Sequence, residues 1–138
     1  MKPAFADTSY YLALVNPTDP AHGVAVDLAE NFLGRIYITD AILIELGSAL
    51  SRGSDRPVYL ELLARLQSDQ ATTLIPASEA LFRQGVALFA KRPDKEWSLV
   101  DCISIVIMKQ RRLKEALTTD HHFVQAGFRA LLREAGGL

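Results

Sequence analysis

An α/β fold, with helices on both faces of a parallel sheet, is predicted by three features of this 138-residue sequence. Short aliphatic runs alternate with longer amphipathic segments, which is the pattern of successive β-α-β units. Residues that favour helix N-termini follow several of the short runs, so a strand leads directly into a helix. Hydrophobic residues make up 49% of the chain, which is enough for the core of one compact domain covering residues 1–138.

The first half of the chain alternates strands and helices in short units. Residues 2–6 are expected to form a strand and residues 10–15 a short helix, and Asp7, Thr8 and Ser9 between them are candidate N-caps. The units that follow, bounded by Gly, Pro or capping residues, are a helix over 20–32, a strand over 36–38, a helix from Thr39 or Asp40 to Leu50, and a helix over 57–66.

In the second half, the apolar segment from Trp97 to Arg112 is ambiguous, because its β-branched centre also suits a buried strand. Ser98 and Asp101 have the spacing of a capping box, with Asp in place of the usual Glu or Gln. The segment is also longer than an ordinary strand and ends in cations that suit a helix C-terminus, so we predict a helix. The other elements expected here are a strand over 72–75, a helix over 78–89, a strand over 116–119, a short helix over 120–126 and a last strand over 128–132.

Charge and cysteine content narrow the class of protein. The formal net charge of −1 argues against coating nucleic acid by bulk charge, although a local basic patch is compatible with it. The single cysteine, Cys102, excludes an intrachain disulfide and suits a small buried side chain in a reducing compartment. The first residues lack the apolar core of a signal peptide, and no apolar run approaches the roughly 18–20 residues that cross a bilayer. We therefore expect a cytoplasmic protein that does not insert into membranes.

Four acidic residues are predicted to lie at the edge of the sheet where the strands end, which is where ligands bind in this type of fold. Asp7 and Asp120 follow strands, whereas Glu45 and Asp101 lie in the first turns of helices. Strand ends and helix starts meet at the same edge of a parallel sheet, so we expect the four carboxylates to converge. Each acid also has a purely structural explanation, as an N-cap, a capping-box acid or, for Glu45, the solvated side of an amphipathic helix.

Such a cluster needs neutralisation by protons or by divalent cations, because two like charges about 4 Å apart repel by roughly 4 kcal/mol at an effective dielectric constant near 20. Oxygen ligands in this number favour Mg²⁺ or Mn²⁺. No Cys/His set has the spacing of a zinc site. His121 and His122 are adjacent, so on a helix their side chains point about 100° apart and are not expected to share one ion.

The segments that carry these acids resemble the four acidic motifs of PIN domains, and in particular the single-domain VapC-type toxins of toxin–antitoxin pairs. They are FADTSYYLAL, ITDAILIELGSAL, WSLVDCISIVIM and ALTTDHHFVQAGF, and the resemblance extends from Phe5 to Phe128. It implies a PIN-like three-layer α/β/α fold with a central parallel sheet of about four to five strands. It also implies a divalent-metal-dependent ribonuclease that hydrolyses RNA phosphodiester bonds, a cognate antitoxin that holds it inactive, and a homodimer.

By the same resemblance, Asp7, Glu45, Asp101 and Asp120 correspond to the metal-binding and catalytic acids. The hydroxyls of Ser98, Thr118 and Thr8 (or Ser9) would orient these carboxylates without binding the metal themselves. Two departures stand out: Val100 replaces a frequent Thr, and His122 replaces a further acid found in some relatives. The second departure puts a second metal position in question.

RNA must be held by groups other than these acids, which repel it. The candidates, with solvated or packed surface residues as the competing reading, are Arg52, Arg56, Lys91, Arg92, Lys95 and, as a base-stacking platform, Trp97. The main alternative is a catalytically silent PIN-fold module that binds RNA or protein. A phosphoacceptor receiver domain is disfavoured because Asp7 has no acidic neighbour, and a dehalogenase-type phosphatase because D-T-S replaces D-x-D.

Overall fold

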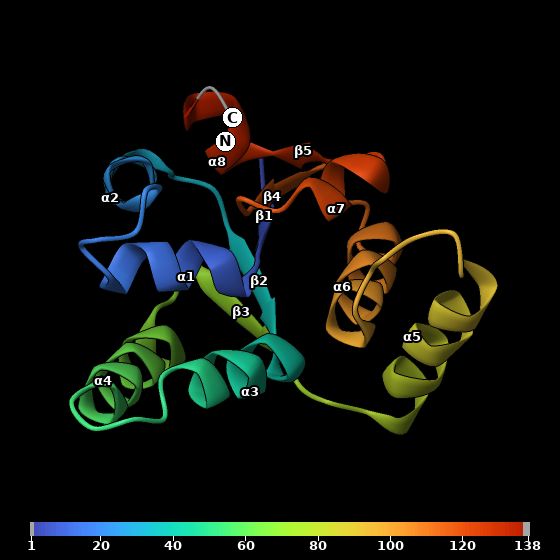
Figure 1. The fold of residues 1–138 in the computed structure, drawn as a ribbon, viewed down its shortest axis with the longest axis horizontal. Helices are drawn as coiled ribbons and strands as arrows, with labels where there is room; N and C mark the ends of the chain where they lie inside the picture. The colour runs from blue at the N-terminus through green and yellow to red at the C-terminus, as the bar shows by residue number, and fades with distance from the viewer. Residues whose placement is uncertain (1, 137–138) are drawn as a thin grey trace.

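Five short strands form one parallel sheet in this computed structural model, which describes residues 2–136 (Figure 1). The strands are β1 (Ala4–Ala6), β2 (Ile36–Thr39), β3 (Thr72–Ile75), β4 (Glu115–Leu117) and β5 (Arg129–Ala130). Their order is β3-β2-β1-β4-β5, and every neighbouring pair is parallel. The chain leaves the central strand β1 first toward β2 and later returns beside it as β4. The carboxyl end of β1 is therefore the topological switch point, where ligands of such sheets bind.

Helices cover both faces of this sheet, as the sequence predicts. In Figure 1, α1 and α2 lie on one side of the strands, and α5 and α6 lie on the other. The helices are α1 (Thr8–Val15), α2 (His22–Asn31), α3 (Asp40–Ala49), α4 (Asp55–Ser68), α5 (Glu79–Lys91), α6 (Leu99–Gln110), α7 (His121–Gln125) and α8 (Leu131–Gly136). None of them, within the described part of the chain, has the length and apolar content needed to span a bilayer.

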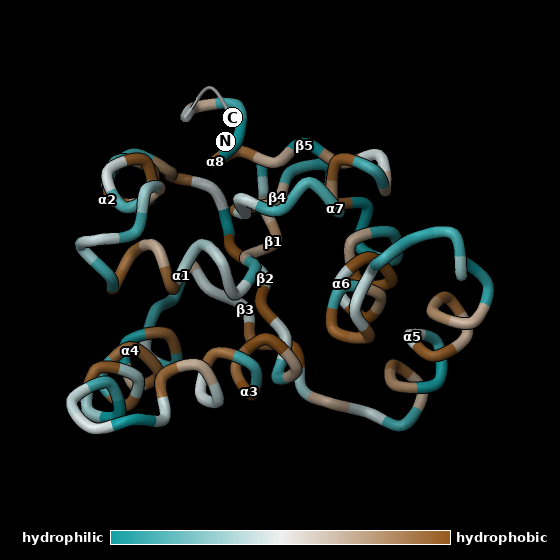
Figure 2. The backbone as a smooth tube through the Cα atoms, in the orientation of Figure 1, coloured by the Kyte–Doolittle hydropathy of each residue, from teal (hydrophilic) through white to brown (hydrophobic). Residues whose placement is uncertain are grey.

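The ambiguous apolar segment is helix α6, and burial explains its composition. Most of its side chains, from Asp101 to Ile105 and again at Ile107 and Met108, are buried. A helix buried on almost every side needs no polar stripe, so its periodicity is lost and it reads like a buried strand. Figure 2 shows the hydrophobic residues concentrated along β1, β2 and α6.

The last predicted strand is wrong in extent. Only Arg129 and Ala130 pair with β4, and the chain then turns into α8, where Leu132 is buried. A mostly apolar stretch of only five residues does not distinguish a strand from one turn of helix. Strand β4 also ends earlier than predicted, at Leu117, which leaves Thr118 and Thr119 outside the ladder. The hydroxyl of Thr118 contacts the carboxylate of Asp7 from this loop position.

Candidate metal centre

Asp7 lies at the switch point, directly after β1, and its carboxylate faces inward. It is the N-cap residue of α1, yet its side chain makes no capping bond, so the structural explanation fails for this residue. Its Oδ2 instead accepts hydrogen bonds of 2.8 Å from Ser9 Oγ and from Thr118 Oγ1. Only 5% of Asp7 is exposed. Two hydroxyls therefore hold a buried carboxylate in a fixed orientation.

The same hydroxyls tie the loop after β1 to the loop after β4. Ser9 Oγ accepts a 3.0 Å bond from the backbone N–H of Thr119, and Thr118 Oγ1 accepts one of 3.0 Å from the backbone N–H of Asp120. The two hydroxyl oxygens are themselves 3.1 Å apart. Asp120 is thus placed relative to Asp7 through the hydroxyls of Ser9 and Thr118, each of which accepts a hydrogen bond from a backbone N–H of the second loop.

Asp101 is both a helix cap and a member of the cluster. It forms the predicted capping box, in which its backbone N–H donates to Ser98 Oγ and its Oδ2 accepts from the backbone N–H of Ser98, each at 3.0 Å. The same Oδ2 lies 3.0 Å from His122 Nδ1. The cost of burying this carboxylate is therefore offset by one backbone N–H and one imidazole.

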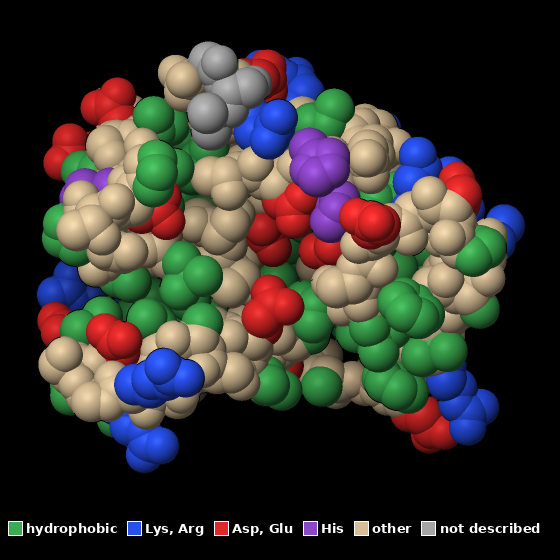
Figure 3. All heavy atoms as spheres, in the orientation of Figure 1, with side chains coloured by type: hydrophobic (Ala, Val, Ile, Leu, Met, Phe, Trp, Pro, Cys, Tyr) green, Lys and Arg blue, Asp and Glu red, His purple; other side chains and the backbone are tan. Residues whose placement is uncertain are grey.

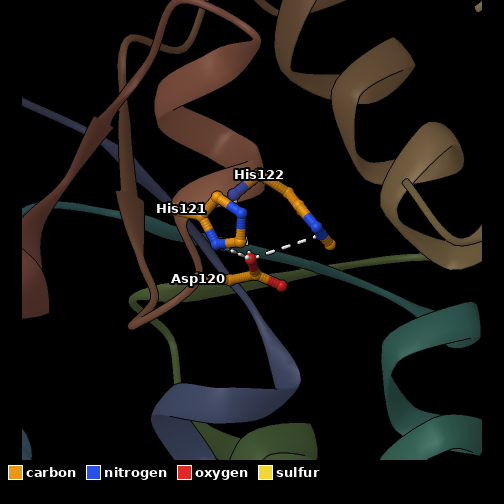
Figure 4. Close-up of side chains that lie close together, drawn as sticks. All are labelled: Asp120, His121 and His122. Atoms are coloured by element: carbon orange, nitrogen blue, oxygen red, sulfur yellow. Dashed lines mark hydrogen bonds and ion pairs between the residues drawn. The ribbon is translucent and has the colours of Figure 1, made fainter. Parts of the chain in front are cut away.

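Asp120 caps the short helix α7, and two histidine rings approach it (Figure 4). Its Oδ1 accepts a 2.9 Å bond from the backbone N–H of His122. The Nδ1 atoms of His122 and His121 lie 3.3 Å and 3.6 Å from that oxygen. The side chain of His121 is 58% exposed and that of His122 only 18%, so His122 is the histidine that faces the interior.

Glu45 joins the cluster through Thr8. It lies in the second turn of α3, half-buried, and its Oε1 accepts a hydrogen bond from Thr8 Oγ1. Thr8 is itself buried and directly follows Asp7 in the chain. The carboxylate of Glu45 is therefore tied to the first residue of α1 and is not simply the solvated side of its own helix.

Burial and neighbouring negative charge both act on the carboxyl group of Asp7. The pKa of Asp7 is raised from 3.8 to about 6, mainly because burial disfavours the charged form, and further because Asp101 and Asp120 are negatively charged neighbours. The hydrogen bonds from Thr118 and Ser9 oppose this rise. Figure 3 shows acidic side chains gathered beside the histidines on this face.

The donor set fits a divalent cation. Between residues 2 and 136, no Lys or Arg forms an ion pair with Asp7, Glu45, Asp101 or Asp120, and the ion pairs of the cluster involve histidine alone. Carboxylate oxygens without a cationic partner are the ligands that Mg²⁺ and Mn²⁺ prefer.

Three hydroxyls predicted to support the acids do contact them: Thr8 contacts Glu45, Ser98 contacts Asp101, and Thr118 contacts Asp7. Of the two alternatives for Trp97, a packed residue at the helix start and a base-stacking platform, the structure supports the packed residue. Its ring is buried, with 5% of the residue exposed, and its Nε1 donates to Gln125, so it offers no surface for a stacked base. Its position between α6 and α7 is that of a core residue.

The basic candidates lie outside the hydrogen-bond network of the acids. Arg92 pairs with Asp94, and Arg56 donates to the carbonyl of Ser51. The sequence reading missed Arg133, whose Nη1 donates at 3.1 Å to the carbonyl of Thr119, immediately before Asp120. Arg133 belongs to α8, which the sequence did not predict, so nothing in the pattern placed it near this loop.

Comparison with known proteins gives a consistent result. The family described as the PIN domain matches residues 4–129. Proteins named 23S rRNA-specific endonuclease VapC20, from two strains of Mycobacterium tuberculosis, are 27% identical over 125 residues, which is 90% of this chain and 94% of theirs.

Solved structures show the same fold. That of Mycobacterium tuberculosis VapC20, described as a Sarcin-Ricin loop cleaving toxin, superposes with a TM-score of 0.82 at 24% identity, covering 91% of this chain and 95% of the other. FitAcB from Neisseria gonorrhoeae superposes with a TM-score of 0.62 at 22% identity, covering 92% and 94%. The predicted PIN-like α/β fold is thereby confirmed.

Proposed function

This chain belongs to the PIN-domain family, and from that premise we propose that it is a divalent-metal-dependent ribonuclease that hydrolyses RNA phosphodiester bonds. PIN domains are nucleases, and the relatives of similar length are named as endonucleases that act on ribosomal RNA. We further propose that this nuclease is the toxin of a type II toxin–antitoxin pair and acts in the cytoplasm.

The observation that carries this proposal is the environment of Asp7. Its carboxylate is buried at the switch point of the sheet, and its pKa is raised to about 6 by burial and by Asp101 and Asp120. A protein that needed only a helix cap here would not bury a carboxylate against two others, because that arrangement opposes folding. A bound cation attracts all three carboxylates and so offsets their mutual repulsion. This is the reason for proposing that the cluster is a metal site.

We assign roles according to the contacts. Asp7, Asp101 and Asp120 bind Mg²⁺ or Mn²⁺, and Glu45 binds it or orients the attacking water. When bound, a divalent cation acidifies water and offsets negative charge on the scissile phosphate. Thr8, Ser9, Ser98 and Thr118 hold the carboxylates in place, as groups behind metal ligands commonly do.

Partners follow from the same family. An antitoxin would hold the enzyme inactive, and two copies of this chain would form a homodimer. Support for a protein-binding face comes from α3 and α5, where Ile44 and Phe82 are 67% and 53% exposed. Between them lies a groove of about 180 Å³ that Leu81 and Ile103 also line.

Light scattering on the wild type and on Phe82→Glu tests the dimer, because a charge on this face should produce monomers.

The decisive experiment uses purified wild type and Asp101→Asn with a mixed RNA pool and with 23S rRNA as a separate arm. Each is incubated with Mg²⁺, with Mn²⁺, and with a chelator. Cleavage by the wild type that requires metal and is lost in Asp101→Asn supports the enzyme. Equal cleavage by both proteins overturns the assignment of this site, and binding of RNA without cleavage of either substrate favours the silent module.

A further inference from the structure

His122 is the least expected member of the acidic cluster. Its Nδ1 lies 3.0 Å from Asp101 Oδ2 and 3.3 Å from Asp120 Oδ1, so one ring nitrogen faces a carboxylate of α6 and the carboxylate that caps α7. Its backbone N–H is fixed by Asp120 Oδ1 at 2.9 Å. Only 18% of its side chain is exposed. The ring is therefore held between Asp101 and Asp120 and is largely shielded from solvent. Figure 4 shows it directed toward Asp120.

We propose that His122 supplies a nitrogen ligand to the metal of this site and biases the site toward Mn²⁺ over Mg²⁺. This inference rests on the proposed function, because it concerns the same metal centre. It adds to that function a nitrogen ligand among the carboxylate oxygens and a preference for one of the two metal ions.

The spacings around Nδ1 are those of neighbouring ligands. An octahedral ion with bonds of about 2.1 Å places adjacent ligand atoms about 3.0 Å apart. The two distances from His122 Nδ1 to the carboxylate oxygens of Asp101 and Asp120 are close to that value. Neutral imidazole binds metal through one nitrogen and keeps its proton on the other. Ligation by Nδ1 requires the tautomer protonated at Nε2, so the metal ion would take the place of the hydrogen bond between Nδ1 and Asp101.

The element bound to the metal affects selectivity. Mg²⁺ is a hard cation with a strong preference for oxygen, whereas imidazole nitrogen raises affinity for transition metals. A site of three aspartates with one imidazole therefore gains more affinity for Mn²⁺ than for Mg²⁺. An acid at position 122 would restore an all-oxygen site.

The other histidines provide internal controls. His121 neighbours His122 in α7, but its side chain is largely exposed and its only contact with the acids is the 3.6 Å approach to Asp120. His22 Nδ1 lies 2.8 Å from the carbonyl of Ala13, in a different part of the fold. Since the chain contains three histidines, selective labelling of this residue type reports on very few positions.

The experiment is pulsed EPR on the full chain, stripped of metal and titrated with Mn²⁺. We expect a nitrogen coupling from a directly bound imidazole in the wild type, which changes to the ¹⁵N pattern when histidine is selectively ¹⁵N-labelled. His121→Asn should retain the coupling and His122→Asn should lose it. The Asn amide keeps a donor near Asp101, so the fold is preserved, and the labelled wild type gives an answer that does not depend on any variant.

Competition between Mn²⁺ and Mg²⁺, followed by calorimetry, tests selectivity. In His122→Asp we expect the preference for Mn²⁺ over Mg²⁺ to fall by about tenfold or more, while His121→Asp leaves it unchanged. Mn²⁺ binding without imidazole coupling in the wild type overturns this inference and leaves the proposed function standing. Failure of the wild type to bind Mn²⁺ at all overturns both.

Discussion

Thr118 Oγ1 donates a 2.8 Å hydrogen bond to Asp7 Oδ2, although the two residues are 111 positions apart in the chain. Together with the bond from Ser9, it favours the ionised carboxylate, while burial and the charges of Asp101 and Asp120 favour the protonated one. Burial prevails, and the pKa of Asp7 lies at about 6. The metal-free protein therefore carries a destabilising charge at neutral pH.

Replacing Asp7 by Asn should stabilise the metal-free protein and abolish cleavage. A folded-state pKa of about 6, against 3.8, means that Asp7 imposes no penalty below pH 3.8. The penalty grows as the pH rises to about 6 and is then constant, at up to about 3 kcal/mol. Urea unfolding with a chelator at pH 4, 5, 6 and 7.5 should show the advantage of Asp7→Asn growing over that interval.

Exposed Asp27 is the matched control, because Asp27→Asn should give a difference that does not grow in the same way. Adding Mn²⁺ should then stabilise the wild type more than Asp7→Asn, because binding to the folded state adds to its stability. If the difference in free energy of unfolding between Asp7→Asn and the wild type were the same at all four pH values, the pKa of Asp7 would not be raised in the folded protein.

Substituting Val for Thr118 should raise the pKa of Asp7 still further. The change removes one of the two hydroxyl donors to Oδ2 and also removes the acceptor for the backbone N–H of Asp120. Loss of a buried partner costs about 1–3 kcal/mol of stability. Carboxyl ¹³C chemical shifts followed against pH report the titration of Asp7 directly. Thr119→Val is the control, since Thr119 enters the network through its backbone, and an unchanged titration in Thr118→Val would contradict the assigned bond.

Thr8 should matter for turnover more than for stability. Its hydroxyl donates to the carboxylate of Glu45 and ties it to the start of α1, and Val has nearly the same shape without the donor. We expect Thr8→Val to lower the rate of RNA cleavage by about 10–100-fold, as for other groups behind metal ligands. Thr8→Ser keeps the hydroxyl and should retain most of the rate in single-turnover assays. Equal rates for the two variants would show that Glu45 is positioned by other contacts.

The convergence of the acids was predictable because it follows from topology. In a parallel sheet the residues after β1 and β4 meet at one edge, so Asp7 and Asp120 could be placed together from sequence alone. The inward direction of His122 could not, because it depends on how the five-residue helix α7 is rotated against α6. Likewise, the burial of Trp97 follows from tertiary packing that no local pattern encodes.

Ser98 combines two functions that a matched pair of variants separates. Ser98 caps α6 by accepting from the backbone N–H of Asp101, and Ser78 caps α5 by accepting from that of Leu81, both at 3.0 Å. Ser98 and Ser78 are both exposed. We therefore expect Ser98→Ala and Ser78→Ala each to lower the free energy of unfolding by about 1 kcal/mol and Tm by a few degrees. Only Ser98, however, orients a carboxylate of the cluster. Calorimetric titration with Mn²⁺ should therefore show weaker binding to Ser98→Ala and unchanged binding to Ser78→Ala, and equal affinities would mean that the capping box serves the helix alone.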